Sequence, residues 1–173
     1  MNKPNTEKLF IRSHPLIIGV MGGATVSQMV VDDAYQLGKL IASEGWILLN
    51  GGRPVGVMDA SAKGAKDAGG ITIGILPDDH AQNMSSYIDI PIVTGLGIAR
   101  NCINILSSHV IVACPGGAGT LSEIALALKS NRPVILLNWH IGNAFSRYES
   151  KGELIHVTKP ENAIDWIKNH NKE

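Results

Sequence analysis

The sequence has few cysteines, no excess of charge of either sign and no long hydrophobic run. Lysine plus arginine and aspartate plus glutamate each number 15, and no basic block exceeds two residues, so a nucleic-acid-binding surface is not expected. No apolar run approaches the ~18 residues that span a bilayer. The first 15 residues are polar and lack the apolar segment of a signal peptide. The sequence therefore predicts a cytoplasmic protein that binds neither nucleic acid nor a membrane.

Metal-ligand spacing is also missing. The two cysteines, Cys102 and Cys114, match neither a zinc motif nor the framework of a disulfide-rich secreted domain. The six histidines are scattered, and none pairs with another four residues along a helix, so no metal site is predicted. Cys114 is expected to be a small buried residue rather than a reactive thiolate, and Cys102 is expected in the core.

The chain does contain many glycines and many apolar residues. Of its 173 residues, 45% are hydrophobic and 19 are glycines, and the glycines fall in short clusters between apolar runs. This length usually forms one domain around one core, so residues 1–173 are predicted to be a single domain. The glycine clusters indicate tight functional loops.

Apolar runs alternate with segments of helical periodicity along the whole chain. Strands are predicted at 15–21, 46–49, 71–76, 88–93, 109–113, 133–137 and 155–157. Helices are predicted at 27–43, 55–67, 98–107, 121–130 and 160–170, with loops at 80–87 and 138–154. Because the strands are apolar on both faces, the pattern predicts an α/β protein: a Rossmann-like, doubly wound parallel sheet with helices on both faces.

Three glycine clusters follow predicted strands: Gly22-Gly23, Gly51-Gly52 and Gly116 to Gly119. In a doubly wound sheet, ligands bind at the carboxyl ends of the strands, where the strand order reverses. Glycine lets backbone N–H groups approach an anion, and helix N-termini add unpaired donors and positive potential. A single cluster can serve a purely steric role, but three at one edge predict a phosphate site.

The loop after the fifth predicted strand is the strongest of the three. It reads Pro-Gly-Gly-Ala-Gly-Thr, residues 115–120, and Thr120 is predicted at the helix cap, where its hydroxyl can cap the helix or contact phosphate. The GxGxxG fingerprint and the GxxxxGK[ST] P-loop are both absent.

The string PGGAGTLSE, residues 115–123, resembles the PGGxGTxxE motif of the family once described as lysine decarboxylases. That family includes the lonely-guy type cytokinin-activating phosphoribohydrolases and the molybdenum cofactor carrier proteins. The likeness extends over most of the chain, through GVMDASAKGAKDAGG, ILP and TGLGIARNCIN. No lysine lies in a pyridoxal-phosphate context, so a decarboxylase is not implied.

The resemblance implies two different functions. A phosphoribohydrolase would cleave the N-glycosidic bond of a nucleoside 5′-monophosphate with Arg100 and Glu123. However, such hydrolases typically carry a second motif acid where this chain has Ser122, an Arg-Lys pair in place of Arg100-Asn101, and a third glycine in place of Arg53. Residues GLGIARN and GAGTLSEIALALK instead resemble the molybdenum cofactor carriers. A non-catalytic nucleotide-sensing module is a third hypothesis.

The carrier interpretation predicts that the chain binds and protects the molybdenum cofactor (molybdopterin), holds its phosphate on the glycine loops and needs no catalytic residue. Molybdoenzymes would then receive the cofactor; the hydrolase alternative takes a nucleotide monophosphate instead. The site is predicted to contain Gly22, Gly23, Ala24, Thr25, Gly51, Gly52, Arg53, Arg100, Asn101, Pro115, Gly116, Gly117, Ala118, Gly119, Thr120 and Glu123.

The predicted helices at 98–107 and 121–130 are apolar around most of their circumference. A helix without a polar face is usually buried, here against another subunit. The resemblance likewise implies a homo-oligomer, either a dimer or a tetramer.

Overall fold

Seven parallel strands form one sheet in the computed structural model, which describes residues 14–170. The strands are β1 (Ile17–Met21), β2 (Ile47–Asn50), β3 (Thr72–Leu76), β4 (Ile90–Val93), β5 (Val110–Ala113), β6 (Val134–Leu137) and β7 (Leu154–Val157). Their order is β4-β3-β2-β1-β5-β6-β7, and every pair is parallel. The predicted Rossmann-like α/β fold is confirmed.

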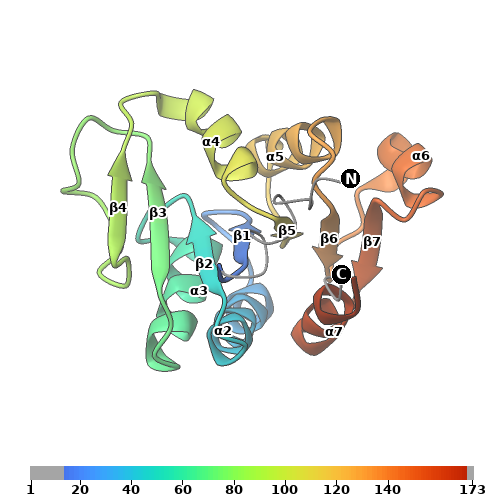
Figure 1. Cartoon of the computed structure of the whole chain (residues 1–173). Coiled ribbons are helices and arrows are strands. Elements are labelled where there is room, and N and C mark those ends of the chain that lie inside the picture. Colours follow the sequence, from blue (N-terminus) through green and yellow to red (C-terminus); the bar gives the residue numbers. More distant parts are fainter. Residues whose placement is uncertain (1–13, 171–173) are drawn as a thin grey trace, which may run out of the picture.

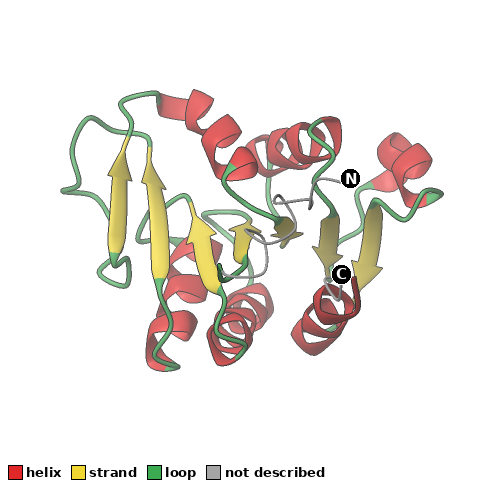
Figure 2. Ribbon diagram, viewed as in Figure 1, coloured by secondary structure: helices red, strands yellow, loops and turns green. Residues whose placement is uncertain are grey.

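Helices cover both faces of the sheet (Figures 1 and 2). On the lower face in Figure 1 lie α2 (Gln28–Ser43), α3 (Gly56–Asp67) and α7 (Pro160–His170). On the upper face lie α4 (Asn101–Leu106), α5 (Ala118–Lys129) and α6 (Ser146–Glu149), with the 3₁₀ turns η1 (Gly97–Arg100) before α4 and η2 (Gly142–Phe145) before α6. Because parallel strands need crossover connections, the alternating sequence pattern leads to this three-layer arrangement.

The core divides into two clusters, one on each face of the sheet. The lower cluster joins α2, α3 and α7 to the sheet and includes Leu37 and Ile164. The upper cluster joins α4 and α5 to the sheet and includes Ile105 and Ile124. Strands β5 and β6 are buried at every position, which explains why their sequences are continuously apolar.

Three local predictions need correction. The segment 138–154 was expected to be a loop, but it contains η2 and α6. The helix expected from Ile98 begins as the 3₁₀ turn η1 and becomes α-helical at Asn101. The helix expected from Leu121 begins at Ala118, so Thr120 lies inside its first turn instead of at the cap.

Within residues 14–170, no helix is both long and apolar enough to cross a membrane. Residues 1–13, which carried most of the polar stretch used to predict a cytoplasmic location, lie outside the described residues. That location and the single-domain assignment therefore stay predictions.

Candidate functional site

The strand order reverses between β1 and β5, since β2 to β4 lie on one side of this pair and β6 and β7 on the other. The loops that leave β1 and β5 therefore diverge and open a crevice at the carboxyl edge. The backbone joins the two loops: Gly23 N donates to the Pro115 carbonyl at 3.0 Å, and Cys114 N donates to the Met21 carbonyl at 2.8 Å. The first and third predicted glycine clusters are thus brought together.

The first turn of α5 forms one wall of this crevice. Gly117 is the N-cap, and no side chain caps the helix, so the N–H groups of the first turn keep no side-chain acceptor. A Cβ added at Gly116 would lie 2.9 Å from Gly23 N and would overlap the Thr120 side chain, so only glycine fits there. A helix N-terminus with open donors and positive potential suits an anion.

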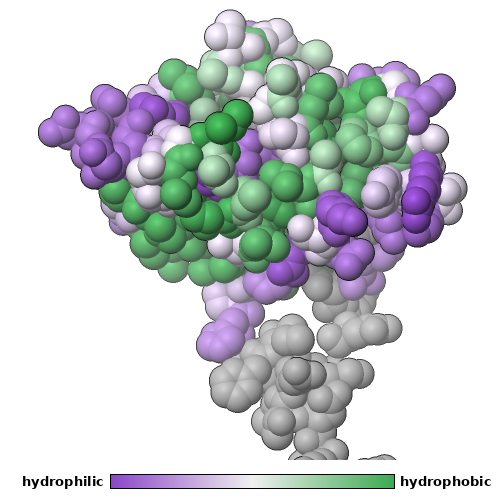
Figure 3. Space-filling model, turned by 90° about the horizontal axis from the view of Figure 1, so that it is seen from above, coloured by the Kyte–Doolittle hydropathy of each residue, from purple (hydrophilic) through white to green (hydrophobic). Residues whose placement is uncertain are grey.

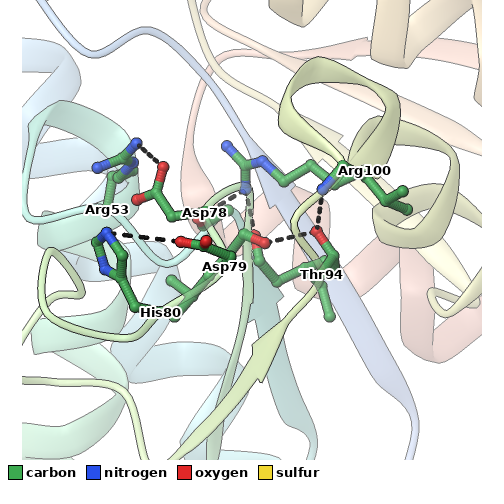
Figure 4. A network of polar contacts seen from close by, with 10 residues as sticks. Arg53, Asp78, Asp79, His80, Thr94 and Arg100 are labelled. Carbon is green, nitrogen blue, oxygen red and sulfur yellow. Dashed lines mark hydrogen bonds and ion pairs between the residues drawn. The ribbon is translucent and has the colours of Figure 1, made fainter.

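The loop after β2 is held by the buried side chain of Asn50. Its amide nitrogen donates to the Met58 carbonyl at 2.8 Å, and its oxygen accepts from Gly52 N at 2.8 Å. Gly52 has φ +72°, and a Cβ there would lie 2.5 Å from Leu76. This turn directs Arg53 toward the end of β3, where Arg53 Nη2 pairs with Asp78 Oδ1 at 3.0 Å (Figure 4).

Arg100, at the end of η1, reaches across to the carboxyl ends of β2 and β3 (Figure 4). Its Nη1 donates to the Gly51 carbonyl at 2.6 Å and also to the Ile75 carbonyl. Burial lowers the pKa of the Arg100 guanidinium, and Glu123 opposes that shift. Arg100 is therefore anchored to the sheet by backbone acceptors and is not a surface ion pair.

Glu123 is buried, with 8% of its surface exposed, in the second turn of α5. Its Oε1 accepts a hydrogen bond from Asn104 Nδ2 at 2.9 Å. Burial raises the pKa of the Glu123 carboxyl, while the Asn104 bond and the charge of Arg100 act in the opposite direction. An exposed acid that only complements the helix dipole would show none of these features.

These elements enclose a cavity of about 520 Å³. Eleven of the sixteen predicted site residues line it, namely Gly22, Gly23, Ala24, Gly51, Arg53, Arg100, Asn101, Gly117, Gly119, Thr120 and Glu123. Five do not: Thr25, Gly52, Pro115, Gly116 and Ala118. Seven lining residues were not predicted: Val20, Met21, Met58, Pro77, Asp78, Gly97 and Ile98. Of these, Asp78 had a signal, because it lies two residues after the third strand at the same sheet edge.

The cysteines separate into one buried and one exposed residue. Cys114 is fully buried, as predicted, and burial raises the pKa of its thiol to about 12. Cys102 was expected in the core, but it lies on the outer side of α4 and is exposed. Across residues 14–170, no group of three or more metal-ligating side chains is assembled.

Comparison with known proteins identifies a family and similar solved structures. The model of the SLOG cluster4 family (LDcluster4) matches residues 15–164. The molybdenum cofactor binding protein from the phototrophic bacterium Rippkaea orientalis is 52% identical; the match covers 91% of this chain and 98% of that chain, with a TM-score of 0.86. The molybdenum cofactor carrier protein MCP from Chlamydomonas reinhardtii is 46% identical, with coverages of 90% and 98% and a TM-score of 0.83.

The phosphoribohydrolases are more distant. The cytokinin riboside 5′-monophosphate phosphoribohydrolase of Mycobacterium tuberculosis is 36% identical over 93 residues, which is 53% of this chain and 50% of that protein. The match therefore spans about half the length of that enzyme. The predicted resemblance to the molybdenum cofactor carriers is confirmed.

Proposed function

The chain belongs to the SLOG cluster4 family, and we propose that it binds and carries the molybdenum cofactor, with the cofactor's phosphate on the glycine loops. Two solved relatives at 52% and 46% identity over about nine tenths of the chain are described as a binding protein and a carrier protein for this cofactor. As a carrier, the protein needs the ligand to be held and shielded, and it needs no reacting side chain.

The observation that carries this proposal is the uncapped N-terminus of α5 facing the β1 loop. Gly117, Gly119 and Thr120 line the cavity from one side, and Gly22 and Gly23 line it from the other. The backbone bond from Gly23 to Pro115 keeps the two walls together. A phosphate placed between them would meet backbone donors from α5 and a hydroxyl from Thr120.

The test is uptake of the cofactor. Purified protein is mixed with released molybdenum cofactor, separated from free ligand, and analysed by mass and absorbance for bound pterin; the rate of cofactor oxidation is followed in parallel. The carrier function predicts uptake and slower oxidation. Thr120→Val should weaken binding by roughly 3- to 30-fold without unfolding the protein, because one hydroxyl contact to phosphate is lost.

The hydrolase is the second candidate, and the placement of Arg100 and Glu123 favours it, because both line the cavity beside the proposed phosphate position. A buried carboxyl with a raised pKa is the kind of group that transfers protons. Incubation with isopentenyl adenosine monophosphate should then release free base. Release that disappears in Glu123→Gln would establish the enzyme and reject a purely carrying role.

We also propose that the protein is a homo-oligomer built on its upper face. The apolar upper face is defined here as the exposed large apolar side chains of η1, α4 and α5: Ile98, Leu106 and Leu121. Seen from above, apolar residues gather over this side of the molecule (Figure 3). An apolar surface of this kind is typical of a subunit contact. Sedimentation should give the mass of a dimer or a tetramer. Leu121→Asp should reduce the mass of the sedimenting particle, because it places a charge in the subunit contact.

A further inference from the structure

The Asn104–Glu123 pair is an unusual feature of the cavity wall. Asn104 is completely buried in α4, and its Nδ2 donates to Glu123 Oε1 at 2.9 Å. Its Oδ1 is buried and has no hydrogen-bond partner among residues 14–170. An unpaired buried carbonyl costs free energy, while the amide nitrogen of the same side chain has two acceptors: Glu123 Oε1 and, at 3.9 Å, Met21 Sδ.

The orientation of this amide depends on the charge of Glu123. A carboxylate only accepts hydrogen bonds, so it matches the donor Nδ2. A protonated Glu123 could donate to Oδ1 after a half-turn of the amide, and that turn breaks no bond at Oδ1 because none exists there. The observed arrangement is therefore the one that stabilises ionised Glu123.

Glu123 presents its remaining acceptor capacity to the cavity that it lines. Its Oε2 makes no hydrogen bond within the described part of the chain. The charged groups on the other elements around this cavity are Arg100 on η1, and Arg53 and Asp78, which pair with each other. Arg100 already donates to two backbone carbonyls, which leaves Glu123 able to accept from a ligand.

We propose that Asn104 is a positioning residue that holds Glu123 as an acceptor-only group, and that Glu123 thereby selects a ligand ring with two adjacent N–H donors on one edge, as in a 2-amino-4-oxopyrimidine. This inference rests on the proposed function for the presence of a ring beside the phosphate. Beyond that function, it names Glu123 as the residue that recognises the ring, and the edge with two N–H donors as the part of the ring that is recognised. A ring with oxygen in place of the amino group would set two acceptors against each other.

Pterin and lumazine provide a matched pair of probes, since lumazine has oxygen in place of the 2-amino group of pterin and both are fluorescent. Fluorescence titration at pH 7 should show that the wild-type protein binds pterin at least about tenfold more tightly than lumazine, because buried donors and acceptors that lose partners are penalised. Glu123→Gln, which presents one donor and one acceptor, should lose this preference. Equal binding of the two compounds by the wild type, or failure of both to bind, overturns the inference.

The role of Asn104 is tested by a pH profile. Pterin affinity should fall as the pH drops through the raised pKa of Glu123, because the protonated form is no longer an acceptor at both oxygens. Asn104→Ala should move this midpoint to higher pH, and a ¹³C NMR titration of the Glu123 carboxyl should show the same shift. Ser108→Ala is the control, because Ser108 is also buried and donates only to the Asn104 carbonyl.

An unchanged midpoint in Asn104→Ala rejects the positioning role. If Asn104→Ala does not fold, the comparison of Glu123→Gln with the wild type still decides the ring preference. The result of the ring-preference test is independent of the result of the cofactor-uptake test. Uptake without preference for pterin rejects this inference alone, while preference for pterin without uptake rejects the carrier function.

Discussion

The two faces of the sheet are built differently. On the lower face, α2 has a clear apolar stripe that is buried, with Leu37 and Ile41 completely covered. On the upper face, η1, α4 and α5 bury Ile105 and Ile124 but leave Ile98, Leu106 and Leu121 exposed. Among the large apolar side chains of the lower helices only Met29 of α2 is exposed, while the upper layer has apolar side chains on both its inner and its outer sides.

Most of the polar side chains at the proposed ligand site come from the upper layer. Arg100 ends η1, and Thr120 and Glu123 belong to α5, whereas the lower helices supply only Met58 to the cavity. The same helices therefore hold buried charge on one side and uncovered apolar surface on another. We therefore propose that the lower face provides most of the stability, while the proposed ligand site and the proposed subunit contact share the upper face.

The largest expected effect tests this division of roles. Leu37→Ala should lower the free energy of unfolding by about 2–5 kcal/mol, because it leaves a cavity at a fully buried position. Leu106→Ala, on the apolar upper face, is the matched control. Its stability loss should depend on protein concentration, since subunit contacts add stability by mass action. Urea unfolding at two protein concentrations measures both, and a concentration-dependent loss in Leu37→Ala would contradict the comparison.

The next effect is confined to the ligand edge. Gly116→Ala should reduce cofactor binding by at least about tenfold, because the added methyl group must displace Thr120 or the β1 loop. Gly117→Ala is the comparison on the same loop: a Cβ there displaces no protein atom, and the residue has φ −104°, which alanine adopts without strain, so a smaller loss is expected. Equal losses in the two variants would mean that the loop does not shape the phosphate position.

A smaller effect is expected on the melting temperature when the buried carboxyl of Glu123, on the upper face, is replaced. The pKa of Glu123 is raised in the folded state, so the native protein binds this proton more tightly than the unfolded chain does. The stability from this group is therefore present below its ordinary pKa near 4.5 and is lost as the pH rises through the folded pKa. Glu123→Gln should raise the melting temperature at pH 7, and the gain should vanish at pH 4. A lower melting temperature at pH 7 would show that the carboxylate stabilises the fold.

The sequence was sufficient to predict the lower face and the sheet. Continuous apolar runs such as Val110–Ala113 identify buried parallel strands, and the period of α2 identifies its buried side. The sequence was insufficient where the local pattern does not determine which side of a helix is buried. The apolar sequence of α4 suggested that Cys102 is in the core, but a helix that is apolar all round does not reveal which side faces the sheet.

The sequence indicated which residues would lie at this edge of the sheet, but it did not indicate their contacts. The glycine loops were located because the strand–loop–helix pattern fixes them at one sheet edge. The pairing of Arg53 with Asp78 and the anchoring of Arg100 on two carbonyls join segments 25 to 49 residues apart, and nothing in the local sequence encodes them. Thr120 was predicted at the cap, but Gly117, which has no side chain, takes that position and Thr120 is the third residue of α5.

The smallest effect concerns the one ion pair at the cavity mouth that joins β3 to the β2 loop. Arg53 and Asp78 retain 31% and 26% exposed side chains, and a partly exposed pair contributes only about 0.2–1 kcal/mol. Arg53→Ala should weaken binding of the phosphate-bearing cofactor about two- to fivefold, because a cation near the anion is lost. Asp78→Asn should strengthen binding by a similar factor, because it removes a negative charge and releases Arg53. Calorimetry at low and high salt checks both, and the differences should shrink at high salt. If both variants change the cofactor affinity in the same direction, the phosphate does not lie near Arg53, and α5 on the upper face would have to bind it without this cation.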